Sequence, residues 1–274
     1  MGIAKLFTPN LVGYMSDELI KMARQDRWLL FAKNAAKWEV QWAAQMRRFF
    51  NLQRDEALDE LGNIRKALGD ELIDIGNWNV RFAEFGQYLL PRIAEDWGNR
   101  ELKNLEVGLS FDVLDPNVLD FARTYAFRFS FEVNRETMEA LNKQMEEGIT
   151  AGDGIPQLRK RIQSLFADMN KYRAERIART EVIRAQNFGA EQSYLQSQVV
   201  AYKEWFTAAD ERRCPFCASL HGRQIRLNNN FHNLGDILES SDGEKIQRLR
   251  LDYEEIKRPP LHPHCRCTLI PIVA

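Results

Sequence analysis

The chain has 274 residues, of which 45% are hydrophobic and 28% are charged, and its formal net charge is −1. This composition fits a folded protein of one or two domains and excludes a disordered chain. The balanced charge also excludes a protein that relies on a global positive field to bind nucleic acid or an anionic membrane.

The N-terminal sequence lacks the features of a secretory targeting signal. Met1 to Asn10 lacks a basic region followed by a long apolar core. The longest charge-free stretch, Leu6 to Ser16, is too short to span a bilayer. We therefore expect no membrane contact and a reducing cytoplasm, where cysteines bind metals or stay free rather than forming disulfides.

Residues 1–110 are predicted to form an α-helical N-terminal region. Ser16, followed by two acidic residues, is a typical helix start, and Asp17 to Leu61 contains neither proline nor glycine. Aromatic and small side chains recur there every three or four residues and so share one helical face: Trp28, Phe31, Ala35, Trp38, Trp42 and Met46. We expect this face to build an intramolecular core, with docking on another subunit as the alternative.

Gly62 and Gly69 mark a break after this first helix. Asp70 to Trp97 is again helical in pattern, and a kink or boundary is expected at Pro91. The mixed stretch Asn99 to Asp115 is predicted to connect the first region to the next.

Residues 111–198 are expected to form the helical part of a second region. Asn134 is predicted to cap a helix that ends near Gly148. A further long helix is predicted to begin at Asn170 or Lys171.

Residues 199–274 change character and are predicted to form a small sheet. Val199 to Thr207 is rich in β-branched and aromatic residues, Arg223 to Leu227 alternates, and Thr268 to Val273 follows the last cysteine. Pro271 confines that last strand to an edge or shortens it. The expected fold is therefore mainly α, with a small C-terminal α+β module built on a short antiparallel sheet.

All four cysteines lie in this module, in two close pairs, Cys214 with Cys217 and Cys265 with Cys267. Zinc prefers four nitrogen or sulfur ligands, and a C-x-x-C turn presents two thiolates to one ion. The pairing predicts a zinc site that closes the module. A disulfide framework and free thiols in the core are the alternatives.

The fourth zinc ligand stays open between Cys267 and His262. In an extended segment, Cys265 and Cys267 face one way while His262 and His264 face the other, which favours four cysteines. A turn at His264 would bring His262 in instead. Because four protein ligands leave no position for a reactive water, the zinc is expected to be structural. His221 is predicted to hydrogen-bond in a turn, and His232 has no ligand spacing to the rest.

Three ordered blocks resemble the signatures of the phage Mu F-like head morphogenesis family, from about Asn134 to Pro271. The first block is Arg176-Ile177-Ala178-Arg179-Thr180-Glu181 with Arg184, Asn187 and Gly189. The second comprises Trp205, Thr207, Asp210, Arg212 and Gly222, and the third His262, Pro263, Cys265, Arg266 and Cys267. Some members carry histidine where this chain has Cys217 and lack the first cysteine, which keeps a metal-binding residue type at position 217.

The resemblance implies a minor capsid protein of a tailed phage or prophage, encoded beside the portal protein and acting in head assembly or genome delivery. It implies a place in the virion near the portal, bacterial cytoplasm during assembly, and the portal or major capsid protein as partner. No catalytic residue and no small-molecule substrate are assigned. Thr180 and Glu181 are expected to serve structure, and Glu175 is spaced to pair with Arg179.

Two other functions stay open. Small cysteine-bound zinc modules also occur in endonucleases, although His232-Asn233 is a poor substitute for a catalytic pair; a zinc-stabilised adaptor is the other alternative. An excess of basic residues between Arg159 and Arg184 leaves weak contact with packaged DNA as an option.

Overall fold

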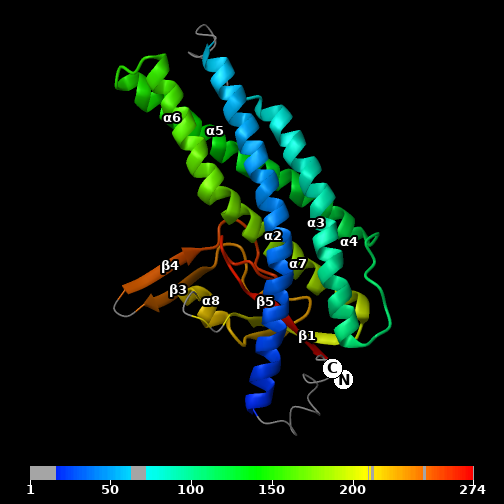
Figure 1. Ribbon diagram of the computed structural model, residues 1–274. Coiled ribbons are helices and arrows are strands. Elements are labelled where there is room, and N and C mark those ends of the chain that lie inside the picture. Colours follow the sequence, from blue (N-terminus) through cyan, green and yellow to red (C-terminus); the bar gives the residue numbers. More distant parts are fainter. Residues whose placement is uncertain (1–16, 63–71, 209, 211–212, 243–244, 274) are drawn as a thin grey trace. The chain divides into compact units, whose positions relative to one another are not determined.

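A computed structural model shows a mainly helical protein with antiparallel β structure towards its C-terminus, as the sequence predicts (Figure 1). It describes residues 17–62, 72–208, 210, 213–242 and 245–273. The predicted cap Ser16, the break at Gly69 and the signature residue Arg212 lie outside these ranges. None of the described helices combines the length and the apolar character that a membrane span requires.

Most of the chain before residue 198 is helical. The α-helices are α2 (Asp17–Gly62), α3 (Ile75–Leu105), α4 (Pro116–Asp120), α5 (Ala126–Thr150), α6 (Ile155–Asp168) and α7 (Ala174–Ser197). Two π-helical turns, η2 (Phe121–Tyr125) and η3 (Met169–Arg173), lead into α5 and α7. Pro91 lies inside α3 rather than at a boundary.

One predicted helix start is wrong. Asn134 does not cap a helix: it is buried inside α5, where it accepts a hydrogen bond from Gln53 at 2.9 Å and donates one to Asn79 at 2.8 Å. Here tertiary packing overrides a residue type that favours helix ends. The helix end predicted near Gly148 is confirmed, because α5 ends at Thr150. Gly148 itself is closely packed, since a Cβ atom there would come within 2.5 Å of Leu158. The predicted start at Asn170 or Lys171 falls within η3, just before α7.

Contacts divide the chain into two compact units. Unit 1 comprises residues up to Trp38, Pro91–Val113 and Arg179–Ala274, and unit 2 comprises Glu39–Leu90 and Leu114–Ala178.

The core of unit 2 is aromatic. The rings of Trp42 and Phe85 have centroids 4.9 Å apart, and those of Phe49 and Phe82 are 4.5 Å apart. Trp42 also contacts Phe129 of α5 edge-on at 5.6 Å. Each such ring pair stabilises the fold by about 0.5–1.5 kcal/mol, in addition to the stabilisation that comes from burying its surface area. The predicted aromatic face of α2 is therefore a core within the chain and not an exposed docking surface.

Unit 1 contains a three-stranded antiparallel sheet in the order β2 (Gln224–Arg226), β1 (Val200–Phe206), β5 (Thr268–Val273). All three predicted strands are confirmed. Strand β5 lies at an edge, so Pro271, opposite Lys203, interrupts no ladder on its outer side.

A second, unpredicted element in unit 1 is the antiparallel hairpin of β3 (Ile237–Asp242) and β4 (Lys245–Arg250). Most of its residues are polar, and of its apolar side chains Leu238 is buried while Ile237 is exposed. Because so few residues of the hairpin are apolar, its sequence lacks the hydrophobic pattern from which strands could be predicted.

A buried polar network anchors β5 to the helices of unit 1. Arg27 is 1% exposed and pairs with Glu101 and with the Tyr194 hydroxyl. Arg27 and Tyr194 both donate to the carbonyl of Leu269, at 3.5 and 3.3 Å. The strand that follows the last cysteine is thus also held to the helices by polar contacts.

Candidate metal centre

The first cysteine pair sits at the start of a short helix, α8 (Pro215–Leu220). Cys214 occupies the N-cap, and its sulfur accepts a hydrogen bond from the backbone N–H of Cys217 at 3.2 Å. Pro215 suits the first helical position because its missing N–H needs no partner there. The C-x-x-C sequence thereby turns both sulfurs towards one point.

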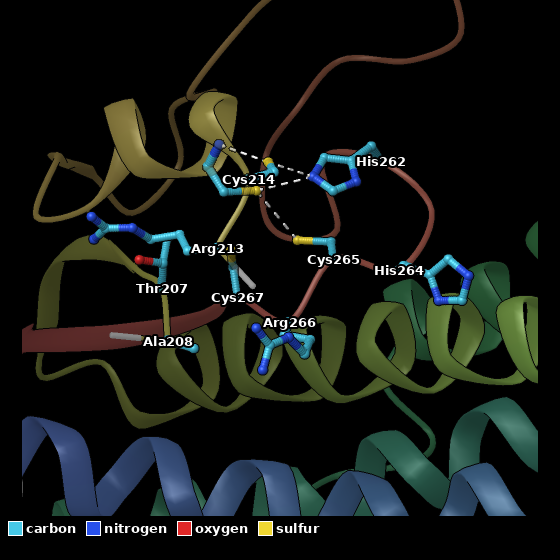
Figure 2. A pocket seen from close by; sticks show the side chains of 10 residues that line it. Thr207, Ala208, Arg213, Cys214, His262, His264, Cys265, Arg266 and Cys267 are labelled. Carbon is cyan, nitrogen blue, oxygen red and sulfur yellow. Dashed lines mark hydrogen bonds between the residues drawn. The ribbon is translucent and has the colours of Figure 1, made fainter. Parts of the chain in front are cut away.

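The second pair follows a turn and not an extended segment. His264 has φ +63°, in the left-handed region, and the N–H of Cys265 donates to the carbonyl of His262 at 3.2 Å. This corrects the extended geometry expected for the segment and realises the alternative, the turn at His264. His262 comes round to the cysteine side, whereas His264 points away from the sulfurs (Figure 2).

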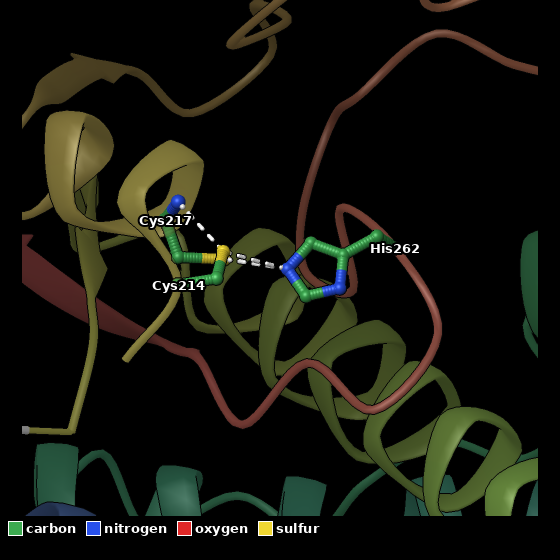
Figure 3. A group of neighbouring side chains, drawn as sticks. All are labelled: Cys214, Cys217 and His262. Carbon is green, nitrogen blue, oxygen red and sulfur yellow. Dashed lines mark hydrogen bonds between the residues drawn. The ribbon is translucent and has the colours of Figure 1, made fainter. Parts of the chain in front are cut away.

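The turn aims His262 at the first pair. Its Nε2 lies 2.9 Å from the Cys214 sulfur and 3.2 Å from the Cys217 sulfur (Figure 3). The Cys217 sulfur in turn lies 3.8 Å from that of Cys265. Ligand atoms lie within 4.8 Å of one another in two groups that share Cys217: Cys214, Cys217 and His262, and Cys217, Cys265 and Cys267. We call these side chains the five-residue cluster.

The donor set suits a zinc ion, and one sulfur–sulfur separation has the length that zinc would set. Zinc–sulfur bonds of about 2.3 Å in a tetrahedron place two sulfurs about 3.8 Å apart. The Cys217 and Cys265 sulfurs have this separation. The imidazole is also in the right form: Nδ1 of His262 lies 2.7 Å from the carbonyl oxygen of Pro263, which can only accept. Nδ1 therefore carries a hydrogen, which leaves Nε2 as the nitrogen that would bind a metal, as in metal-binding histidines.

Without a cation, the sulfurs of the cluster cannot all be ionised. A hydrogen bond from Cys217 lowers the pKa of Cys214 to about 4, and the reciprocal bond raises the pKa of Cys217. Burial opposes protonation of His262, yet its bond to Cys214 and the charge of Cys265 raise its pKa to about 9. A bound cation would allow every thiol to ionise, so metal uptake must release protons.

A buried indole lies beside the remaining sulfur. Trp205 is fully buried, and its Nε1 has no hydrogen-bond partner within the described part of the chain. Burial raises the pKa of Cys267 well above its usual value, and the neighbouring Trp205 side chain offsets only part of this rise. An orphaned N–H beside a sulfur is satisfied best when that sulfur is an anionic acceptor.

Helix α7 clamps the backbone of the second pair. Asn187 is fully buried; its amide donates to the carbonyl of Cys267 and accepts from the N–H of Leu269, both at 3.1 Å. Thr180 accepts a hydrogen bond from the N–H of His264 at 3.3 Å. The same helix therefore holds the turn that carries His262 and Cys265 and the residue Cys267 that precedes β5.

A bidentate ion pair holds Arg266, the residue between Cys265 and Cys267. The Arg266 guanidinium binds both carboxylate oxygens of Asp210, at 2.6 and 2.5 Å. The carbonyl of Arg266 accepts a hydrogen bond from the indole of Trp28 at 2.9 Å. The residue between Cys265 and Cys267 is thus fixed from both its backbone and its side chain.

Residues 139–270 match the family model described as phage Mu protein F like protein. This segment is similar to that family. The resemblance predicted from the sequence is thereby confirmed, and it points to a role in phage head morphogenesis. Comparison with curated proteins and with solved structures gave no match.

The three signature blocks of the Mu F-like segment meet around the five-residue cluster. Asn187 of the first block bonds the backbone of Cys267 in the third, and Asp210 of the second pairs with Arg266 of the third. Gly222 has φ +80°, which explains a glycine at that turn. These polar signature residues thus make structural contacts.

Of the other predicted polar residues, His221 accepts a hydrogen bond from the backbone N–H of Thr207 at 3.2 Å, as expected of a turn residue. Glu175 pairs with Arg47 at 2.8 Å, a contact that its four-residue spacing from Arg179 did not predict. The position of the Trp205 indole beside Cys267 could not be predicted from the sequence. Trp205 belongs to a signature block, but an indole is not a metal ligand.

We expect the Asp210–Arg266 pair to stabilise unit 1 modestly. Its side chains are 36% and 18% exposed, so Asp210→Asn should lower the free energy of unfolding by about 1 kcal/mol. The exposed pair Glu239–Arg248 provides the control, because Glu239→Gln should have almost no effect. Urea unfolding of both variants checks this, and equal effects would contradict it.

Proposed function

We propose that this chain is a minor head protein of a tailed phage or prophage, a structural component near the portal vertex that acts in head assembly or genome delivery. The observation that carries the proposal is the family match over residues 139–270, whose signature residues converge on one structural centre. The portal protein or the major capsid protein is the proposed partner, and the virion is the proposed location.

We further propose that one zinc ion is bound by Cys214, Cys217, Cys265 and His262. Thiolate and imidazole ligands are typical of zinc. His262 is preferred to Cys267 because its Nε2 lies within 3.2 Å of two cysteine sulfurs and is held in the ligand tautomer. With four protein ligands, the metal serves structure.

The structural role follows from the size of the C-terminal module. A three-stranded sheet and a two-stranded hairpin bury little apolar area of their own. The metal would join α8 to the segment that enters β5, which are distant in sequence. A structural zinc site contributes about 10–16 kcal/mol of apparent binding energy, enough to fix such a module.

DNA is not among the proposed partners. Several basic side chains between Arg159 and Arg184 make contacts within the chain: Arg161 pairs with Asp153 at 2.6 Å, Arg173 with Glu136 at 2.9 Å, and Arg184 with Glu254. These pairings weaken the case for phosphate contact, because a guanidinium already bound to a carboxylate adds less positive field.

The endonuclease alternative centres on His232. Its Nδ1 lies 3.3 Å from a carboxylate oxygen of Asp236, and its Nε2 lies 3.2 Å from a guanidinium nitrogen of Arg223. Burial, together with the charge of Arg223, lowers the pKa of His232. We expect the purified protein with Mg²⁺ or Mn²⁺ to leave supercoiled plasmid intact, and His232→Ala to behave identically. Metal-dependent nicking that disappears in His232→Ala would make the chain an endonuclease.

Co-expression with the portal protein encoded in the same gene neighbourhood tests the proposed function. We expect the two proteins to co-purify through a size-exclusion column and cross-linking to join specific lysines of the two chains. The major capsid protein serves as the second candidate partner in the same assay. Binding to neither, together with absence of the chain from purified virions, would favour the adaptor alternative.

A further inference from the structure

The five-residue cluster contains one side chain more than a tetrahedral zinc ion requires. We infer that Cys267 is a reserve ligand, able to take the place of His262 on the metal while Cys214, Cys217 and Cys265 remain bound. The inference rests on the proposed zinc centre and adds to it a second set of four ligands.

The shared position of Cys217 makes both sets reachable. Cys217 belongs to the group with Cys214 and His262 and equally to the group with Cys265 and Cys267. Cys217 would therefore hold an ion within reach of both His262 and Cys267. The cysteine pairs alone supply four thiolates, so departure of His262 need not leave an open coordination position.

The two exchanging side chains are anchored differently. Cys267 is 3% exposed, its carbonyl is bound by Asn187, and its thiol lies beside the Trp205 indole. His262 is half-buried on a loop, and its ring is oriented by the carbonyl of the adjacent Pro263. Cys267 is thus held by residues far away in sequence, whereas the His262 ring is oriented by its neighbour in sequence.

The left-handed residue His264 separates these two parts of the segment. His262 precedes the turn, and Cys265 and Cys267 follow it. A rotation of the His262 side chain would withdraw its ring without moving the two cysteines, which are held through Asn187 and Arg266.

The exchange balances without an external reagent. The bond from the metal to Nε2 of His262 breaks, and a bond to the Cys267 sulfur forms. The thiol of Cys267 gives up its proton, and Nε2 takes up a proton. Nothing is oxidised or reduced, and the net charge of the centre is unchanged.

Alanine variants of the full chain test the inference, since alanine cannot bind a metal. We expect His262→Ala and Cys267→Ala each to retain about one zinc per chain by elemental analysis, while the double variant binds zinc about 100-fold more weakly. The cobalt-substituted proteins give a second measurement. Thiolate-to-cobalt absorption should rise by about a third in His262→Ala, where four thiolates replace three, and stay unchanged in Cys267→Ala.

The outcomes separate this inference from the zinc proposal. Loss of zinc in His262→Ala, with zinc retained in Cys267→Ala and in the parent, would overturn the reserve ligand and leave the zinc centre standing. Loss of zinc in Cys267→Ala alone would make Cys267 a resident ligand and likewise overturn the inference. A parent protein without zinc would overturn both. Far-UV circular dichroism of the single variants shows that each comparison is made on folded protein.

Discussion

We expect Cys217→Ser to abolish metal binding and to loosen the C-terminal module, while the aromatic core of unit 2 stays folded. This is the largest effect that we expect from a single substitution. The Cys217 sulfur contacts both Nε2 of His262 and the sulfur of Cys265, so no other side chain can replace it. Loss of one of four ligands should weaken zinc binding by about 3 kcal/mol or more, which destabilises the folded module equally.

Hydrogen exchange resolved by segment measures this directly. Amides of β1, β5 and α8 should lose protection, whereas those of α5, which packs on Trp42 through Phe129, should keep it. Chelation of zinc from the parent should reproduce the pattern. Ser219→Ala is the matched control, because this exposed residue of α8 lies outside the cluster. Parental protection of β5 in Cys217→Ser would contradict a metal clamp.

Gly189→Ala destabilises unit 1 by about 3 kcal/mol or more, because the added methyl group has no space. A Cβ atom at position 189 would lie 2.1 Å from the carbonyl oxygen of Ala94 and 2.7 Å from its Cα. These are backbone atoms of α3, which cannot turn aside as a side chain can. Relief of the overlap would have to move α7, the helix that holds Cys267 through Asn187.

Gly76→Ala provides the control for this prediction. It makes the same substitution near the start of α3, where the nearest atom to a new Cβ is a side-chain oxygen of Asp74 at 3.4 Å. We expect it to be neutral or to stabilise the helix by up to about 1 kcal/mol. Thermal unfolding of the two variants measures both changes, and a Gly189→Ala protein as stable as the parent would refute the close packing.

The sequence predicts features that depend on local spacing. The aromatic face of α2 follows from residues three and four apart. Strand β1 follows from a run of β-branched and aromatic residues, and β2 follows from alternation. The cysteine pairs indicate a metal site because C-x-x-C spacing and two-residue spacing each place two thiols together. Features that depend on distant partners escape this reasoning, among them the buried Asn134 inside α5.

The candidate metal centre also combines features set by local spacing with features set by distant partners. Its five side chains could be named from the sequence, but the turn at His264 could not be chosen over an extended segment. That turn depends on the N–H of His264 meeting Thr180 on α7, a residue far away in sequence. The role of Asn187 likewise becomes clear only when α7 and β5 are seen side by side, because an asparagine within a helix has no distinctive pattern.

The zinc content of the purified full-length chain tests the central claim most directly. Protein produced in zinc-supplied cells, kept reduced and freed of loosely bound metal by dialysis, should contain about one zinc per chain by elemental analysis. The same protein carrying Cys217→Ser should contain almost none. Metal-free parent protein whose β1–β5 sheet is nevertheless fully protected from hydrogen exchange would contradict the account.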